Sequence, residues 1–142
     1  MATGNKFNQF VSDVNNKVHN LGSDTLKVML TNVAPTAANA VLADITEIAN
    51  GNGYTTGGAT VTVSSSVQSG GVYKLVGSAA SPTWTASGSV GPFRYVVLYN
   101  STPGSPLKPL ICYWDYGSNL TLAAADTFTV VFDATNGILQ DS

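Results

Sequence analysis

The sequence predicts a mainly β protein, a single-domain two-sheet β-sandwich (jelly-roll or immunoglobulin-like) with one N-terminal α-helix. Apolar residues recur at helical spacing within residues 1–22, and from residue 24 onward the period changes to two. Short strand-like runs then alternate with Gly- and Pro-rich turns. At 142 residues the chain suits one domain. We divide it into an N-terminal helical segment, 1–22, and a β-sandwich, 23–142.

The helix is expected over Lys6–His19, because its apolar side chains form one stripe. The stripe consists of Phe7, Phe10, Val11, Val14, Val18 and Leu21. Asp13 precedes Lys17 by four residues, which is the favourable orientation for a helical ion pair. Two roles remain open for this helix, namely packing on its own sheet or reaching a partner subunit. In the first case Phe10, Val14 and Val18 should be buried.

The strands follow from alternation and from two apolar runs. Residues 26–30 alternate and predict a half-buried strand. Further strands are expected at 59–65, 72–76, 83–86, 93–99, 109–116 and 127–133. Phe93–Tyr99 and Pro109–Tyr116 are apolar at nearly every position, so both of their faces should be covered. We therefore expect these two as adjacent central strands, with the opposing sheet on one face and the helix on the other.

The segment 34–58 is a long connection rich in Ala, Asn and Gly. A connection of this length in a compact domain is usually functional or an interaction arm. We predict an arm that becomes ordered on contact with a partner, which lets it cover a large surface. Its apolar anchors would be Ile45, Ile48 and Tyr54, and its polar rim would be Asp44 and Glu47.

Composition excludes several classes of protein. Charged residues make up 10% of the chain, where ~25% is typical. The net charge is −2 and the six Lys and Arg residues are scattered, which argues against a nucleic-acid partner. No apolar run approaches the ~18 residues of a membrane span. No apolar run follows Lys6, so we expect no secretory signal, and one cysteine suits folding in a cytoplasm.

A search for catalytic chemistry finds no combination of residues that predicts an enzyme. His19 is the only histidine, and its position near a helix end indicates a boundary residue. Cys112 lies among apolar neighbours, where a thiol stays protonated. Asp44 and Glu47 lack the buried surroundings that tune a catalytic carboxyl. Asp133 begins a run that lacks the last ligand of a calcium loop and suits an Asx turn. We predict no catalytic residues, no cofactor and no metal.

Aromatic residues are concentrated on the two apolar strands. They are Tyr95, Tyr99, Tyr113, Trp114 and Tyr116. Such residues either fill a core and an oligomer interface, which we favour, or line a groove for a sugar or a peptide. A groove of exposed aromatic residues flanked by Asp or Asn would favour glycan binding.

Several segments together carry a resemblance to a known group. They are 20–32 (NLGSDTLKVMLTN), 42–48 (LADITEI), 51–58 (GNGYTTGG), 95–100 (YVVLYN), 113–118 (YWDYGS), 128–134 (FTVVFDA) and 137–138 (GI). In this combination the chain resembles small virion proteins of tailed bacteriophages. The Gly-Tyr-Thr-x-Gly-Gly element followed by Thr-rich strands is the most specific part.

The resemblance implies a structural virion protein of the capsid decoration, or cement, kind. Such a protein binds the major capsid protein on the capsid surface, as a homo-oligomer for which we favour a trimer. It would be made in the host cytoplasm. The resemblance brings no catalytic residues to this chain. The alternative is a tail or head-fibre component that binds a host-surface glycan.

Overall fold

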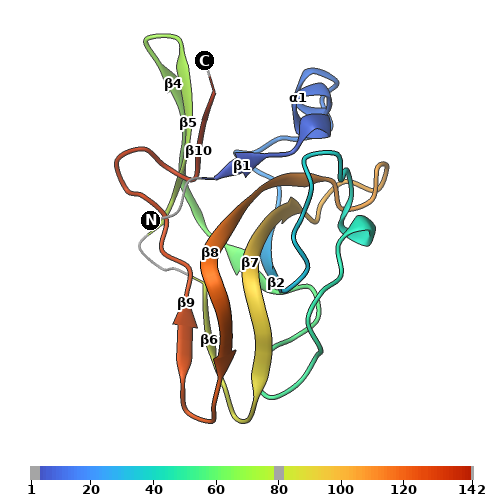
Figure 1. Ribbon diagram of the computed structural model, residues 1–142. Coiled ribbons are helices and arrows are strands. Elements are labelled where there is room, and N and C mark those ends of the chain that lie inside the picture. The colour runs from blue at the N-terminus through green and yellow to red at the C-terminus, as the bar shows by residue number, and fades with distance from the viewer. Residues whose placement is uncertain (1–3, 79–81, 142) are drawn as a thin grey trace.

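The computed structural model describes residues 4–78 and 82–141. Within these residues the chain forms three antiparallel sheets and one α-helix (Figure 1). The helical elements are α1 (Asn8–Asn15) and a 3₁₀ turn, η1 (Leu42–Asp44). The strands are β1 (Asn5–Lys6), β2 (Leu26–Thr31), β3 (Ala59–Val61), β4 (Val63–Ser69), β5 (Val72–Gly77), β6 (Thr83–Thr85), β7 (Val90–Asn100), β8 (Leu110–Leu122), β9 (Thr127–Thr129) and β10 (Leu139–Asp141). The predicted mainly β sandwich with an N-terminal helix is confirmed.

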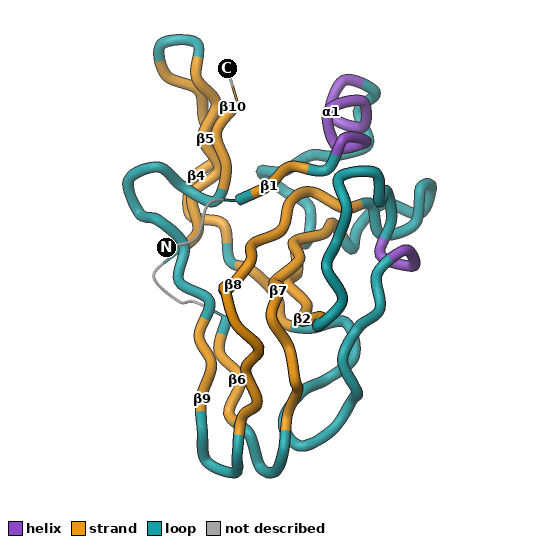
Figure 2. The backbone as a smooth tube through the Cα atoms, viewed as in Figure 1, coloured by secondary structure: helices purple, strands orange, loops and turns teal. Residues whose placement is uncertain are grey.

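The largest sheet has five strands in the order β1-β8-β7-β2-β3. β7 and β8 are antiparallel neighbours, with Val96 opposite Trp114 and Val97 opposite Tyr113, which confirms the predicted pairing. The second layer is divided between a three-stranded sheet, β10-β5-β4, and a two-stranded sheet, β6-β9. Figure 2 shows these two small sheets at opposite ends of the long strands β7 and β8.

The main core lies between the five-stranded sheet and the two small sheets. The five-stranded sheet contributes Leu26, Val28, Leu30, Val96, Leu98 and Trp114 to it, and the small sheets contribute Leu75, Leu139, Trp84 and Phe128. Alternation along β7 places Val96 and Leu98 on this inner face. Each small sheet therefore covers a different part of the same apolar surface.

The outer face of the five-stranded sheet is also buried, but the helix does not cover it. Met29, Val97, Tyr99 and Leu110 form a second cluster there with Phe7, and Leu42 and Ile45 of the 34–58 segment pack on it. β2 is consequently buried on both faces and is not the half-buried strand that its alternation predicted. The chain covers its own outer face with a residue before α1 and with a loop that sequence analysis predicted to be a free arm.

The helix is shorter and less buried than predicted. It covers Asn8–Asn15 instead of Lys6–His19. Phe10 is buried in the main core with 2% of its surface exposed, as predicted. Val14, in contrast, is 37% exposed, and Val11 is exposed as well. Val18 lies beyond the helix and is half-buried. Within α1, Phe10 is therefore the only residue of the predicted stripe in the main core, and Leu21, beyond the helix, is buried there as well.

The end of α1 has a local cause. Lys17 has a φ of 62°, in the left-handed region, which stops the helix. Asp13 does not form the expected pair with Lys17. It is buried, and its carboxylate accepts a hydrogen bond from Gln9 Nε2 at 2.9 Å.

The different exposures of Phe10 and Val14 predict that alanine substitutions at these two positions lower the free energy of unfolding by different amounts. Phe10→Ala should lower the free energy of unfolding by ~3–5 kcal/mol, because it removes a fully packed ring. Val14→Ala should stay within about 0.5 kcal/mol of wild type, because that side chain is at the surface. Urea unfolding of both variants measures the difference. Equal costs for the two substitutions would contradict this packing.

Candidate functional site

The structure places Tyr54, one of the predicted partner anchors, inside the protein. The side chain is 1% exposed, and its hydroxyl accepts a hydrogen bond from the Leu30 N–H at 3.1 Å. The same hydroxyl donates to Glu47 Oε1 at 2.6 Å, and the Gly57 N–H donates to that oxygen at 2.6 Å. Glu47 and Tyr54 are thus brought together by a hydrogen bond inside the protein and not at a partner-binding surface. This corrects the expectation that Tyr54 is an anchor for a partner.

Ile45 and Ile48 are separated by the sheet. Ile45 packs on the outer cluster, whereas Ile48 packs on the main core. Between them, the Thr46 carbonyl accepts a hydrogen bond from Thr31 Oγ1, and the Ile48 N–H donates to the Leu30 carbonyl at 3.1 Å. β3 pairs only with Leu26–Val28, so residues 46–48 occupy the edge of β2 beyond it. The segment is ordered by its own sheet and does not need a partner to become ordered.

Asp44 remains exposed and stabilises the 3₁₀ turn. One carboxylate oxygen accepts hydrogen bonds from the Ala40 N–H at 2.9 Å and the Val41 N–H at 3.2 Å. These backbone hydrogen bonds lower the pKa of Asp44. Its carboxylate is therefore ionised near neutral pH. Its observed hydrogen bonds stabilise the 3₁₀ turn.

Two buried phenols hold the end of the 34–58 segment. Burial, and then the hydrogen bond to Glu47, raise the pKa of Tyr54. The Tyr99 hydroxyl donates to the Gly57 carbonyl at 2.6 Å, and burial raises the pKa of Tyr99 to about 12. Both hydroxyls therefore stay protonated and act as permanent donors. Glu47, Tyr54, Gly57 and Tyr99 form a structural network.

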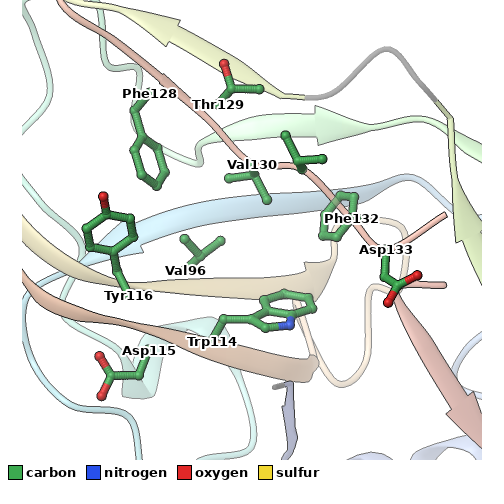
Figure 3. A pocket seen from close by; sticks show the side chains of 10 residues that line it. Val96, Trp114, Asp115, Tyr116, Phe128, Thr129, Val130, Phe132 and Asp133 are labelled. Atoms are coloured by element: carbon green, nitrogen blue, oxygen red, sulfur yellow. The ribbon is translucent and has the colours of Figure 1, made fainter. Parts of the chain in front are cut away.

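The best candidate for a binding site is a cleft of ≈ 560 Å³ between β8 and residues 128–133 (Figure 3). β9 ends at Thr129, whereas a strand was predicted to continue to Asp133. The cleft is lined by Val96, Trp114, Asp115, Tyr116, Phe128, Thr129, Val130, Val131, Phe132 and Asp133. Most of these side chains are apolar or aromatic.

Four aromatic rings line the cleft in two pairs. Trp114 and Phe132 have ring centroids 5.6 Å apart, and Tyr116 and Phe128 have centroids 5.9 Å apart in an edge-on arrangement. Trp114 and Tyr116 are two residues apart on β8 and point to the same, inner face. Trp114 is buried at the floor, whereas Tyr116 is 55% exposed. The cleft is thus an opening of the main core to the surface.

The two acidic residues of the lining differ in position. Asp133 closes one end, and its carboxylate accepts hydrogen bonds from the Thr135 and Asn136 N–H groups and from Asn136 Nδ2, which lower its pKa. This is the predicted Asx turn. Asp115 points away from the cleft in Figure 3 and pairs with Arg94 Nε at 2.8 Å and Nη2 at 3.0 Å. That pair lowers the pKa of Asp115.

The remaining tyrosines of β7 and β8 lie outside the cleft. Tyr95 is half-buried beside Arg94, and Tyr113 packs against Phe7 at 5.1 Å. Sequence analysis missed Phe128 and Phe132 as cleft residues. Their only signal was the alternation of 128–132, which predicted an ordinary strand with a buried face.

His19 and Cys112 occupy structural positions. His19 Nδ1 lies 3.1 Å from Asn100 Nδ2, which also donates to Asp24 Oδ2 at 2.6 Å. Since an amide nitrogen only donates, Nδ1 must be the acceptor and the ring is neutral. Burial lowers the pKa of His19, although Asp13 and Asp24 oppose this. Cys112 is fully buried, and this burial raises the pKa of its thiol.

Across residues 4–78 and 82–141, His, Cys, Asp and Glu side chains form no group that could hold a metal ion. No helix in the described part of the chain is long and apolar enough to cross a membrane. The chain matches no protein-family model, no curated protein and no solved structure.

The Tyr54 link can be tested by removing one oxygen. Tyr54→Phe leaves the Leu30 N–H without its partner and leaves Glu47 Oε1 with the Gly57 N–H as its one remaining donor, so it should cost ~1–3 kcal/mol of unfolding free energy. Tyr116→Phe is the matched control and should be neutral, because Tyr116 is exposed. A Tyr54→Phe variant as stable as wild type would show that the network does not hold the segment.

His19 predicts a pH dependence of stability. Its pKa in the folded protein is below the ordinary 6.5, so the unfolded chain takes up a proton first as the pH falls. The contribution of neutral His19 is therefore complete above about 6.5 and is lost as the pH falls toward the folded-state pKa. The stability advantage of wild type over His19→Gln should shrink in this window, measured by urea unfolding at several pH values. An advantage that does not change with pH would contradict the assignment.

Proposed function

We propose that this chain is a non-enzymatic structural virion protein of a tailed phage, which decorates and stabilises the capsid by binding the major capsid protein. The resemblance of segments within residues 20–138 to small virion proteins of tailed bacteriophages supports this class of protein. The structural observation in favour is a surface that is ordered without a partner and presents exposed apolar side chains. The protein would act on the capsid surface as a small homo-oligomer, for which we favour a trimer.

This surface, which we call the α1 surface, consists of α1, residues 36–44 and the loop 101–109 (Figure 1, upper right). Backbone hydrogen bonds join its three parts. The Asn8 N–H donates to the Ala37 carbonyl at 2.9 Å, and the Leu42 N–H donates to the Lys108 carbonyl at 2.9 Å. The Leu110 N–H donates to the Ala40 carbonyl at 3.0 Å. Three segments distant in sequence thus form one rigid surface.

The α1 surface presents exposed apolar side chains and an exposed carboxylate. Leu107 is 63% exposed, Val11 is exposed on the outer side of α1, and Asp44 lies exposed in the 3₁₀ turn. Apolar side chains with a polar rim are typical of protein contacts. Because its backbone is already ordered, binding here avoids the entropic cost of ordering a free arm. Low surface charge suits close packing of many copies on a shell.

The second candidate function is that of a tail or head-fibre component that binds a host-surface glycan. The cleft favours it, because aromatic side chains line the cleft and Asp133 closes one end. The measurement that separates the two is the copy number of the protein in purified particles, by mass spectrometry against the major capsid protein. Hundreds of copies are expected for decoration, and a handful would indicate a tail or fibre component.

The α1 surface predicts a selective loss of capsid binding. Leu107→Asp should abolish co-sedimentation with undecorated capsids, because it places a charge in an apolar contact. Val67→Asp, on the β4–β5 hairpin, is the control, because Val67 is similarly exposed and lies outside this surface. Both variants should unfold like wild type. Wild-type occupancy of shells by Leu107→Asp would exclude this surface as the contact.

A further inference from the structure

We propose that the cleft between β8 and residues 128–133 binds a neutral saccharide by stacking a sugar ring on Tyr116. This inference deepens the second candidate function and supplies its site and ligand class. The cleft volume of ≈ 560 Å³ falls within the ~300–1,000 Å³ of small-molecule sites. It is large enough for a mono- or disaccharide unit.

The aromatic wall is held in place before any ligand binds. Tyr116 is the most exposed ring of the cleft, and its neighbour Phe128 fixes it from one side. Phe128 itself packs edge-on against Phe93 at 4.9 Å and stacks near Trp84 at 6.2 Å. A chain of contacts thus runs from the buried core to the exposed ring. Such preorganisation reduces the cost of binding a ring-shaped ligand.

Polar groups lie at both ends of the apolar wall. Tyr116, with its hydroxyl, lies at the Phe128 end, and Asp133 lies at the Phe132 end (Figure 3). The Asp133 carboxylate is fixed by three N–H donors and stays ionised, since its pKa is lowered. A sugar ring presents C–H groups on its face and hydroxyls at its edge. The Tyr116 ring complements the C–H face of a sugar, and the Asp133 carboxylate can accept hydrogen bonds from its hydroxyls.

The charges of the lining define the ligand further. Asp133 supplies the carboxylate at the end of the cleft, because Asp115 points away and pairs with Arg94, and the lining contains no Lys or Arg. This charge disfavours acidic sugars, because an anionic ligand would meet Asp133 without a compensating cation. A purely apolar side chain of a partner protein fits less well. It would remove water from Asp133 without offering a hydroxyl in return.

The test uses the purified full-length protein and methyl glycosides of glucose, galactose and N-acetylglucosamine, with glucuronic acid as the acidic sugar. Binding is followed by tryptophan fluorescence, since Trp114 lies at the cleft floor, and by calorimetry. At least one neutral glycoside should bind, and glucuronic acid should bind more weakly. Tyr116→Ala should weaken binding about tenfold, which corresponds to ~1.4 kcal/mol.

Tyr95→Ala is the matched control. Tyr95 precedes Val96 on β7, so its side chain points to the opposite face of the same sheet. The Tyr95→Ala variant should bind the glycoside as tightly as wild type does. Thermal melts should show that the Tyr95→Ala and Tyr116→Ala variants both fold. The proposal is overturned if no neutral glycoside binds, if Tyr116→Ala binds equally well, or if glucuronic acid binds more tightly. It is also overturned if the amphiphilic anion anilinonaphthalene sulfonate occupies the cleft and no sugar displaces it.

The outcome is independent of the position of the protein on the virion. A high copy number with sugar binding would support decoration and this site together. A low copy number without sugar binding would support a tail or fibre component and would contradict the proposed saccharide site. Failure of this inference and failure of capsid decoration are therefore distinguishable.

Discussion

The constraint on which the rest of the structure depends is that the central strands are apolar on both faces. Val96 and Leu98 of β7 point to the main core, and Val97 and Tyr99 point to the outer cluster. A sheet of this kind needs two covers. The small sheets supply the inner one, and Phe7 with the 34–58 segment supplies the outer one. Once the outer face is filled in this way, α1 is left at the edge of the molecule, where only Phe10 reaches the core.

The outer cover is a loop, so specific contacts must replace the regular hydrogen bonds of a sheet. Glu47 and the two buried tyrosines provide them. Close approach of the backbone also requires glycine at Gly58, which has a φ of 77°, because a Cβ there would collide with the Val28 carbonyl oxygen. The glycines that suggested a mobile arm in the sequence thus serve, at least at this position, to bring the chain close to β2.

The sequence was sufficient for features that depend on local pattern. The continuous apolar runs predicted the pairing of β7 with β8, and the apolar neighbours of Cys112 predicted its burial. It was not sufficient where the outcome depends on contacts between distant residues. Nothing local shows that Tyr54 reaches the Leu30 N–H, or that Val14 faces solvent while Phe10, four residues earlier, does not. The cleft was equally hidden, because the pattern of 128–132 predicted a buried face but not that β9 would end at Thr129.

The two proposed surfaces lie on different parts of the molecule. The α1 surface combines α1, at the edge of the molecule, with residues 36–44 of the outer cover. The cleft lies on the inner side of β8, beside residues 128–133. Phe128 is fixed by Phe93 and Trp84 and not by any residue of the α1 surface. Occupation of one surface therefore need not disturb the other. A subunit attached to a shell through the α1 surface could still present its cleft to a saccharide, so the two candidate functions are physically compatible in one protein.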